Sequence, residues 1–376
     1  MSKSHRRPLA VALSAALGML VLAPVGHVYA EPQSQTMSKQ EERARRRAEL
    51  GKGQQKAEEA KPALYPNATR QSPEAKASPK LIKHLQELQA RYEKDDWAGV
   101  IAKAEELVAM PAANAYEKSF AYSMAGNAAA NMDDQPKAGE FFAKAVDANG
   151  MDNDGHFSTM YNLAIIQYGN EKYADALKTM DRFLAESKSE KPEHLSFRAG
   201  VLANLERYDE AAAIYKDLIA KNPDDKRLLM NAVSSLQSAD KFDDANVLLE
   251  SAYKRGMLTE KRELRALYIG YMNAQRWDDA KKVIDDGVAK GILQKDADLA
   301  RDYQILAQNA YMDDKIPQAI ELYKLAAPLA ADGEAYLNLA KVLDYADRKA
   351  EAKAAAKQAL EKGVKKPEEA NRILAR

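Results

Sequence analysis

The sequence predicts an all-α fold, a solenoid of about eight helical hairpins. One amphipathic helical phrase recurs along residues 119–366, and the interval between successive copies is 33 to 39 residues. A second helical phrase recurs about twelve residues before it, with small side chains where two antiparallel helices would lie closest. A period near 34 residues is typical of a helical-hairpin repeat, because each unit buries its apolar face only against its neighbours.

Residues 1–30 have the features of a secretory signal peptide. Three basic residues precede an apolar run that begins at Leu9, and small residues stand at its end. We expect cleavage after Ala30 and a mature protein in solution in a bacterial periplasm, without stable membrane insertion. The alternative is an uncleaved anchor, although the apolar run is shorter than the roughly 20 residues that a bilayer needs.

Residues 31–80 are predicted to form a flexible, disordered basic tail or linker. They contain eleven Lys and Arg residues against seven Asp and Glu, and few large apolar side chains. Such a segment buries too little apolar surface to offset the entropy lost on ordering. It either only solvates the chain or docks on an anionic surface or an acidic partner.

The solenoid is predicted to span residues 81–376, and its first unit, 81–115, is a degenerate cap. In this unit Val100 stands where the other units have alanine, and Trp97 stands where Tyr208 and Trp277 stand in theirs. Terminal repeats of a solenoid are commonly atypical, because their outer face meets water.

The repeats themselves run from about 119 to 366. In the phrase "YDEAAAIYKDL", the side chains of Ala211, Tyr215 and Leu218 share one helical stripe, and Pro223 ends the helix. We expect this stripe to be buried by the hairpin partner near Leu195–Leu205 and by the next repeat. The equivalent alanines are Ala138, Ala176, Ala211, Ala245, Ala280, Ala319 and Ala352.

The other helix of each hairpin is marked by residues twelve positions before the aligned alanine. Most of them are small, and a larger side chain there would push the two helices apart. They are Gly126, Ala164, Ala199, Val233, Tyr268, Ala307 and Ala340. After the last repeat, residues 367–376 are predicted to form a C-terminal helix that solvates the end of the array.

Composition argues against several classes of function. Residues 81–376 hold 42 basic and 49 acidic side chains, so we expect no nucleic-acid binding. The chain has no cysteine, and the only histidines after residue 30 are His84, His156 and His194, widely spaced. We therefore expect no catalytic residue, no cofactor and no metal site. A hydrolase or transferase hidden in the solenoid is the alternative class.

Two acidic patterns are interpreted as structural. Asp152, Asn153 and Asp154 precede Gly155 as in a calcium loop, but Tyr161 stands where the bidentate glutamate belongs. We therefore interpret this segment as helix capping by Asp154. Acidic pairs that recur at one repeat position are interpreted as helix N-terminal charge, and they are Asp209-Glu210, Asp243-Asp244 and Asp278-Asp279.

The repeat pattern resembles that of tetratricopeptide repeats (TPR). The shared features are a small residue at the eighth position, alanine at the twentieth and an aromatic or aliphatic residue at the twenty-fourth. The resemblance implies a right-handed solenoid whose first helices line a groove for an extended peptide or a partner's helix. The groove positions of that family correspond here to Asn127, Asn131, Tyr161, Tyr168, Arg227, Met230, Arg262, Arg265, Met272, Arg301 and Tyr311.

Arg227, Arg262 and Arg301 occupy one repeat position in three consecutive units. An arginine fork suits carboxylates, so the partner is expected to carry an acidic segment or a chain terminus. The alternative is that these arginines are solvated residues at helix starts. The lysine-asparagine clamp of the chaperone-binding subtype is not reproduced.

The order of the units and phrases such as "TMYNLAIIQYGNEKYADALKTMDRFL" resemble the periplasmic TPR proteins associated with TonB-ExbB-ExbD energy-transduction systems. The resemblance implies a protein-protein interaction scaffold that assists uptake through outer-membrane receptors. Its partners would be TonB, ExbB or ExbD-type components, or another envelope protein. The alternative is a scaffold for envelope assembly or peptidoglycan synthesis, of the Tol-associated type.

Overall fold

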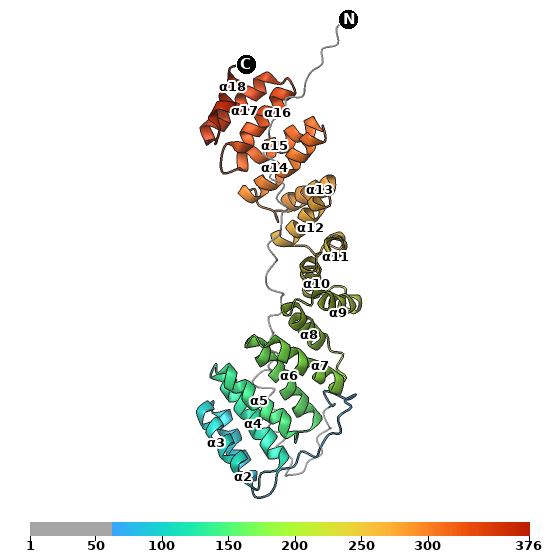
Figure 1. The fold of residues 1–376 in the computed structure, drawn as a ribbon, viewed down its shortest axis with the longest axis vertical. Coiled ribbons are helices and arrows are strands. Elements are labelled where there is room, and N and C mark those ends of the chain that lie inside the picture. Colours follow the sequence, from blue (N-terminus) through green and yellow to red (C-terminus); the bar gives the residue numbers. More distant parts are fainter. Residues whose placement is uncertain (1–61) are drawn as a thin grey trace. The chain divides into compact units, whose positions relative to one another are not determined.

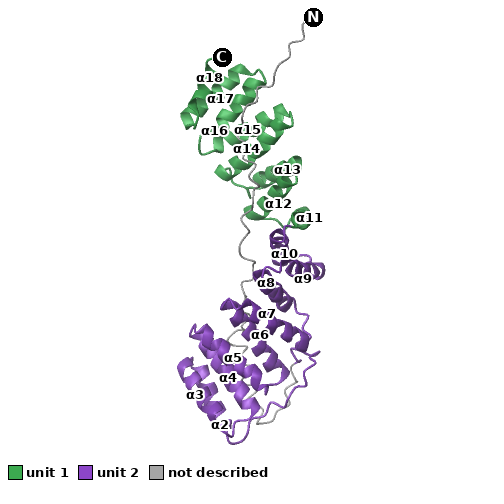
Figure 2. Cartoon of the chain, in the orientation of Figure 1, with its two compact units in different colours: residues 1–24, 241–376 green, residues 25–240 purple. Residues whose placement is uncertain are grey.

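The computed structural model describes residues 62–376. The predicted signal peptide and the first part of the predicted tail, residues 31–61, lie outside the described residues. The described chain forms two compact units, residues 62–240 and residues 241–376 (Figure 2). The boundary falls between two helices that the sequence places in one hairpin.

The unit of residues 62–240 is built from antiparallel helices that follow one another along the chain (Figure 1). From α2 to α10, each helix packs against the next one along the chain within this unit. The helices are α2 (Ile82–Glu93), α3 (Trp97–Ala109), α4 (Ala115–Asn131), α5 (Gln135–Ala148), α6 (Asn153–Gly169), α7 (Tyr173–Ser187), α8 (Pro192–Asn204), α9 (Tyr208–Lys221) and α10 (Lys226–Ser238).

The unit of residues 241–376 has the same organisation and ends with an additional short helix. Its helices are α11 (Phe242–Lys254), α12 (Lys261–Asn273), α13 (Trp277–Ala289), α14 (Ala297–Met312), α15 (Ile316–Leu329), α16 (Glu334–Tyr345), α17 (Lys349–Lys362) and α18 (Pro367–Leu374). The described residues contain no strand, so the predicted all-α solenoid of helical hairpins is confirmed. None of the described helices combines the length and the apolar character that a membrane crossing requires.

The repeat positions read from the sequence form the core. All seven aligned alanines have no exposed surface. The residue four positions later is also buried in every unit, and its side chain fills the seam between helices. These residues are Phe142, Met180, Tyr215, Leu249, Ile284, Tyr323 and Ala356. In the hairpin of α8 and α9, the Tyr215 hydroxyl donates to the carbonyl of Ser196 on α8, as the predicted pairing requires.

The turn inside each hairpin also repeats. Five residues before the aligned alanine, or before Val100 in the first repeat (81–115), the chain takes a left-handed conformation with φ between 56° and 63°. In seven of these turns the next residue donates its N–H to a carbonyl in the last turn of the first helix, for example Asp134 to Ala129 at 3.0 Å. This closure satisfies carbonyls that the helix end leaves without a partner.

Helix starts agree with the predicted acidic pairs but not with the predicted cap. Each of the three pairs lies in the first turn of its helix, α9, α11 or α13. At α6, however, the N-cap is Asp152, whose carboxylate accepts from the N–H of Gly155 at 2.8 Å. Asp154 instead accepts from the N–H of Leu64. The prediction of capping by Asp154 was therefore wrong, because the helix begins two residues earlier than expected.

Two terminal segments pack more closely than the sequence suggested. Helix α18 contacts α16 and α17, and buries Ala370 and Ile373, so it closes the last hairpin rather than only solvating it. Residues 62–80, which belong to the predicted flexible tail, lie against the ends of α4, α6, α7 and α8. This segment contains one aromatic residue, Tyr65, whose side chain is buried at 7% exposure.

Candidate functional site

Residues 62–80, which we call the strap, form an extended segment without helix or strand, blue in Figure 1. The strap begins with a turn in which the N–H of Ala68 donates to the carbonyl of Tyr65 at 3.3 Å. Pro66 stands at the second position of this turn, where its fixed φ favours the geometry. The strap is therefore an example, within this chain, of an extended segment held on the repeats.

Tyr65 occupies an aromatic pocket formed by three helices. Its ring centroid lies 5.3 Å from that of Phe157 on α6 and 5.7 Å from that of Phe183 on α7, both edge to face. The ring of His194 on α8 stacks at 6.2 Å, and the Lys191 ammonium lies 5.4 Å from the Tyr65 centroid. Edge-to-face aromatic pairs and cations near a ring face are attractive beyond simple burial.

Arg70 binds the carboxyl end of helix α5. Its Nε and one Nη donate to Asn149, to the side-chain oxygen at 2.9 Å and to the carbonyl at 3.1 Å. The same guanidinium donates to the carbonyl of Met151 at 3.0 Å and to the side chain of Asn153 at 2.8 Å. A helix C-terminus carries partial negative charge and unpaired carbonyls, so a planar cation is suited to this position.

Carboxylates around this socket add to its negative charge. Burial lowers the pKa of Arg70, and the nearby Glu186 and Asp152 carboxylates oppose that shift. The backbone of the strap is held as well, since the N–H of Thr69 donates to the carbonyl of Glu186 at 2.8 Å and the carbonyl of Arg70 accepts from Asn153 at 3.0 Å. The socket therefore recognises an arginine and the main chain next to it.

The end of the strap rests on the start of α4. The Glu117 carboxylate, which is fully buried, accepts from the N–H and the hydroxyl of Ser78 at 2.7 and 2.6 Å. Its other oxygen completes a capping box with Asn114, whose side chain also donates to the carbonyl of Lys76. Between strap residues 73–79 and the start of α4 lies an open cleft of about 390 Å³.

The predicted groove residues in the unit of residues 62–240, the first unit, lie mainly away from the strap. Asn127 and Asn131 form a ladder on α4, in which each side-chain amide donates to the carbonyl four residues earlier. Tyr168 packs on Phe197 and accepts from Asn204 at 2.9 Å. Arg227 is exposed and Met230 is half-buried on α10.

Tyr161 is the predicted groove residue that borders the strap pocket. Its ring lies 4.6 Å from that of His194 and 5.6 Å from that of Phe183, two of the residues that hold Tyr65. Burial raises the pKa of the Tyr161 hydroxyl. The structure thus joins one predicted position to a pocket that sequence analysis did not identify.

The predicted groove residues of the second unit differ in exposure. Arg262 is exposed and pairs with Glu260 at 2.9 Å, and Arg301 is exposed and pairs with Asp298. Tyr311 is half-buried and packs against Tyr345, with ring centroids 5.7 Å apart. Met272 is only 2% exposed and offers almost no surface. Of the three arginines at one repeat position, Arg262 and Arg301 share this unit, while Arg227 lies in the other.

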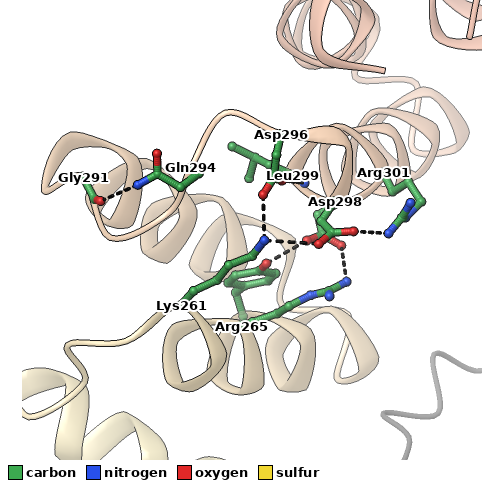
Figure 3. A network of polar contacts seen from close by, with 10 residues as sticks. Lys261, Arg265, Gly291, Gln294, Asp296, Asp298, Leu299 and Arg301 are labelled. Atoms are coloured by element: carbon green, nitrogen blue, oxygen red, sulfur yellow. Dashed lines mark hydrogen bonds and ion pairs between the residues drawn. The ribbon is translucent and has the colours of Figure 1, made fainter. Parts of the chain in front are cut away.

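A polar network joins α12 to α14 in the second unit (Figure 3). Lys261 donates to Asp296 at 2.7 Å and to Asp298 at 3.1 Å. One turn further along, Arg265 donates to Asp302 at 3.3 Å. Burial raises the pKa of Asp302, whereas its contact with Arg265 opposes that shift. Lys261 and Arg265 of α12 thus make contacts between helices, whereas Arg262 of the same helix pairs with Glu260.

The described residues hold no group of three or more His, Asp or Glu side chains that could bind a metal ion. His156 has no exposed surface, and neither ring nitrogen has a hydrogen-bond partner. Burial lowers the pKa of His156 to about 3 and that of His194 to about 4. Both histidines are therefore neutral near pH 7; His194 packs on Tyr65 of the strap, and His156 packs on Phe157 behind it.

No protein-family model matches the sequence, and no curated protein matches it. Among solved structures, a tetratricopeptide repeat protein from Parabacteroides merdae is 16% identical, with a TM-score of 0.40 over 68% of this chain and 97% of that one. YrrB, described as a TPR protein with an unusual peptide-binding site, is 20% identical, with a TM-score of 0.40 over 52% of this chain and 97% of that one. These comparisons assign no function to the chain.

Proposed function

We propose that this protein is a non-enzymatic scaffold that binds extended segments of other proteins on its helical hairpins. The observation that carries this proposal is the strap. Its backbone and side chains are held by hydrogen bonds from successive hairpins, including those of Glu117 on α4 and Asn153 on α6. A surface that holds one extended segment through main-chain contacts and side-chain pockets has the features of a peptide-binding surface.

We further propose that the exposed arginines of the first helices bind carboxylates of a partner. Arg262 and Arg301 pair with carboxylates close to them in sequence, Glu260 and Asp298. Exposed pairs of this kind contribute little to stability, so a partner's carboxylates can replace them at small cost. The side chain of Arg227 is exposed on α10, so it too is accessible to a carboxylate of the partner.

The partner that we propose is a component of a TonB-ExbB-ExbD energy-transduction system, met in the periplasm after export. This proposal is supported by the resemblance of the repeat phrases to periplasmic TPR proteins associated with such systems. The alternative is an envelope-assembly or peptidoglycan-synthesis scaffold, supported by the same predicted signal peptide and all-helical organisation. The identity of the protein that is captured distinguishes the two.

Site-specific photo-crosslinking in cells tests the scaffold function. A photoreactive amino acid at Tyr168 or Arg301 should label the same partner, which mass spectrometry then identifies. The same group at Lys216, on the second helix α9, or at Lys290, the C-cap of the second helix α13, is the control and should not label that partner. Equal labelling from all four positions, or from none, would refute the scaffold proposal.

Charge reversal tests the role of the arginines. Replacing Arg227, Arg262 and Arg301 by glutamate should remove at least nine-tenths of the crosslink formed from Tyr168, because the carboxylates of the partner would be repelled. The matched control replaces Lys216, Lys254 and Lys290 by glutamate, which changes the net charge equally on the second helices. An undiminished crosslink in the arginine variant would show that these arginines do not bind the carboxylates of the partner.

A further inference from the structure

We propose that the surface under the strap is a binding site for a partner segment in which an aromatic residue is followed, five positions later, by an arginine. The chain's own Tyr65 and Arg70 occupy this site in cis and compete with the partner. This inference rests on the proposed scaffold function and names a second class of partner for it. The site differs from the predicted groove, since it lies at the ends of helices α4 to α8 and accepts a cation.

Recognition at this site is concentrated at two side chains. The aromatic pocket of Phe157, Phe183 and His194 encloses the ring of Tyr65. The segment from the end of α5 to the start of α6 accepts four hydrogen bonds from Arg70, two at Asn149, one at Met151 and one at Asn153. Lysine offers one point charge without a planar fork and cannot reproduce the four bonds in this geometry. The site therefore selects an aromatic residue and an arginine at a fixed separation.

The receiving surface is formed by contacts that do not involve the strap. Asn149, at the end of α5, takes a left-handed conformation, and Asp152 caps α6 through the N–H of Gly155. The capping box of Asn114 and Glu117 is internal to α4. These features keep the acceptors in place when the strap leaves, so a partner segment meets a preformed site.

The strap fits this surface incompletely. Tyr65 is the only residue of the strap that is buried, and most of the others are exposed. Its last part leaves the cleft of about 390 Å³ between itself and α4 unfilled. A segment with so little apolar burial is held largely because it is tethered, which gives it a high effective concentration. A partner segment that also fills the cleft can displace it.

The charge of the site determines the chemistry of the partner. Glu186 and Asp152 both favour the charge of Arg70. Arg182, which pairs with Glu186, opposes it, and Asp154 accepts from the strap backbone. An acidic segment would be repelled here, whereas a basic one would be attracted. We therefore assign the site to a partner segment that is basic at the arginine position, and not to the acidic segment proposed for the exposed arginines.

The test uses the full chain and a fluorescent peptide with the sequence of residues 62–80. In the variant Tyr65→Ala/Arg70→Ala the cis competitor is released, so the peptide should bind this variant at least tenfold more tightly than it binds the wild type. Peptides that carry Tyr65→Ala or Arg70→Lys should bind the same variant at least tenfold more weakly than the unaltered peptide. Fluorescence anisotropy measures all of these affinities.

Control variants distinguish release of the strap from loss of the binding surface or of the folded structure. The variant Gln71→Ala/Glu74→Ala changes two exposed strap residues and should bind the peptide as weakly as the wild type does. Adding Asn153→Ala to Tyr65→Ala/Arg70→Ala removes a socket contact and should weaken peptide binding. Circular dichroism should show unchanged helix content in the strap variants, because the strap contributes no helix.

Three results would overturn the inference. The first is no binding of the peptide to the released variant, and the second is equal binding to this variant and to the wild type. The third is a concentration-dependent dimer of the wild type that Tyr65→Ala/Arg70→Ala abolishes, which would make a second copy of the chain the occupant. In each case the crosslinks from Tyr168 and Arg301 would still report on the scaffold function, so the two failures can be distinguished.

Discussion

The carboxylate of Asp302 on α14 accepts a 2.7 Å hydrogen bond from the hydroxyl of Tyr268 on α12. Both residues are 1% exposed. Tyr268 occupies the repeat position that is alanine or glycine in most other units, so its ring reaches the first helix of the next hairpin. The large residue at a position expected to be small is thus explained by a polar contact between hairpins.

Replacing Tyr268 with phenylalanine should lower the free energy of unfolding by about 1 to 3 kcal/mol. The substitution removes one partner of a buried carboxylate, and a buried acceptor without its donor costs roughly this amount. Urea unfolding followed by circular dichroism measures the change. Tyr345→Phe is the control, because Tyr345 is 64% exposed and its loss of a hydroxyl should change little. Equal stability of Tyr268→Phe and the wild type would contradict the importance of this contact.

Much of the fold was predictable because the repeat positions are fixed by contacts inside and between hairpins. The alanine at the aligned position is fully buried in all seven repeats, so it recurs and can be read from the sequence. The left-handed residue five positions earlier is a different case. It is Asp133 in one unit but Glu171, Glu206 or Gln275 in others. The conformation is imposed by closing the hairpin, and no single residue type marks it.

The strap could not be predicted because its order depends on residues far away in sequence. Composition averaged over residues 31–80 gives a disordered tail, and only "LYPNATR" contains an aromatic residue next to a turn signal. Nothing in that phrase indicates that Phe157, Phe183 and the end of α5 would form its socket. Met272 shows a related limit, since a groove position carried over from a repeat pattern says little about how deeply its side chain is buried.

Tyr215→Ala should destabilise the first unit by about 3 to 5 kcal/mol, as large aromatic truncations in cores do. The ring has no exposed surface and fills the seam between hairpins, and its hydroxyl bonds to Ser196. Thermal melting followed by circular dichroism measures the loss. Asp217→Ala, at an exposed position of the same helix, serves as the comparison and should melt as the wild type does. An unchanged melting temperature for Tyr215→Ala would show that the register of α9 is wrong.

Two glycines should respond to alanine substitution in opposite directions. A Cβ at Gly126 would lie 2.7 Å from the ring of Phe142, so Gly126→Ala should destabilise the hairpin of α4 and α5 by about 1 to 3 kcal/mol. A Cβ at Gly169, the last residue of α6, would meet no atom within 4 Å. Gly169→Ala should therefore stabilise the protein by up to about 1 kcal/mol, through reduced backbone entropy of the unfolded chain. Chemical denaturation measures the change in the free energy of unfolding for each variant. Changes of the same sign would exclude the close approach at Gly126.

Acidification should weaken the first unit before carboxylates are protonated. His156 and His194 have folded pKa values of about 3 and about 4, lowered chiefly by burial. Their unfolded pKa is about 6.5, so the unfolded chain binds protons below this value while the folded unit does not. Each histidine then lowers the free energy of unfolding by about 1.4 kcal/mol per pH unit below 6.5. For His194 this loss ends near pH 4, and for His156 it continues to about 3.

Unfolding measured in urea between pH 7.5 and 5 isolates this effect, because ordinary carboxylates stay ionised there. The free energy of unfolding should be level above pH 6.5 and fall by roughly 2 to 4 kcal/mol by pH 5. In a His156→Phe/His194→Phe variant the decline over this interval should disappear, whatever the absolute stability. A wild-type profile without decline would mean that these rings reach solvent and take up protons in the folded unit.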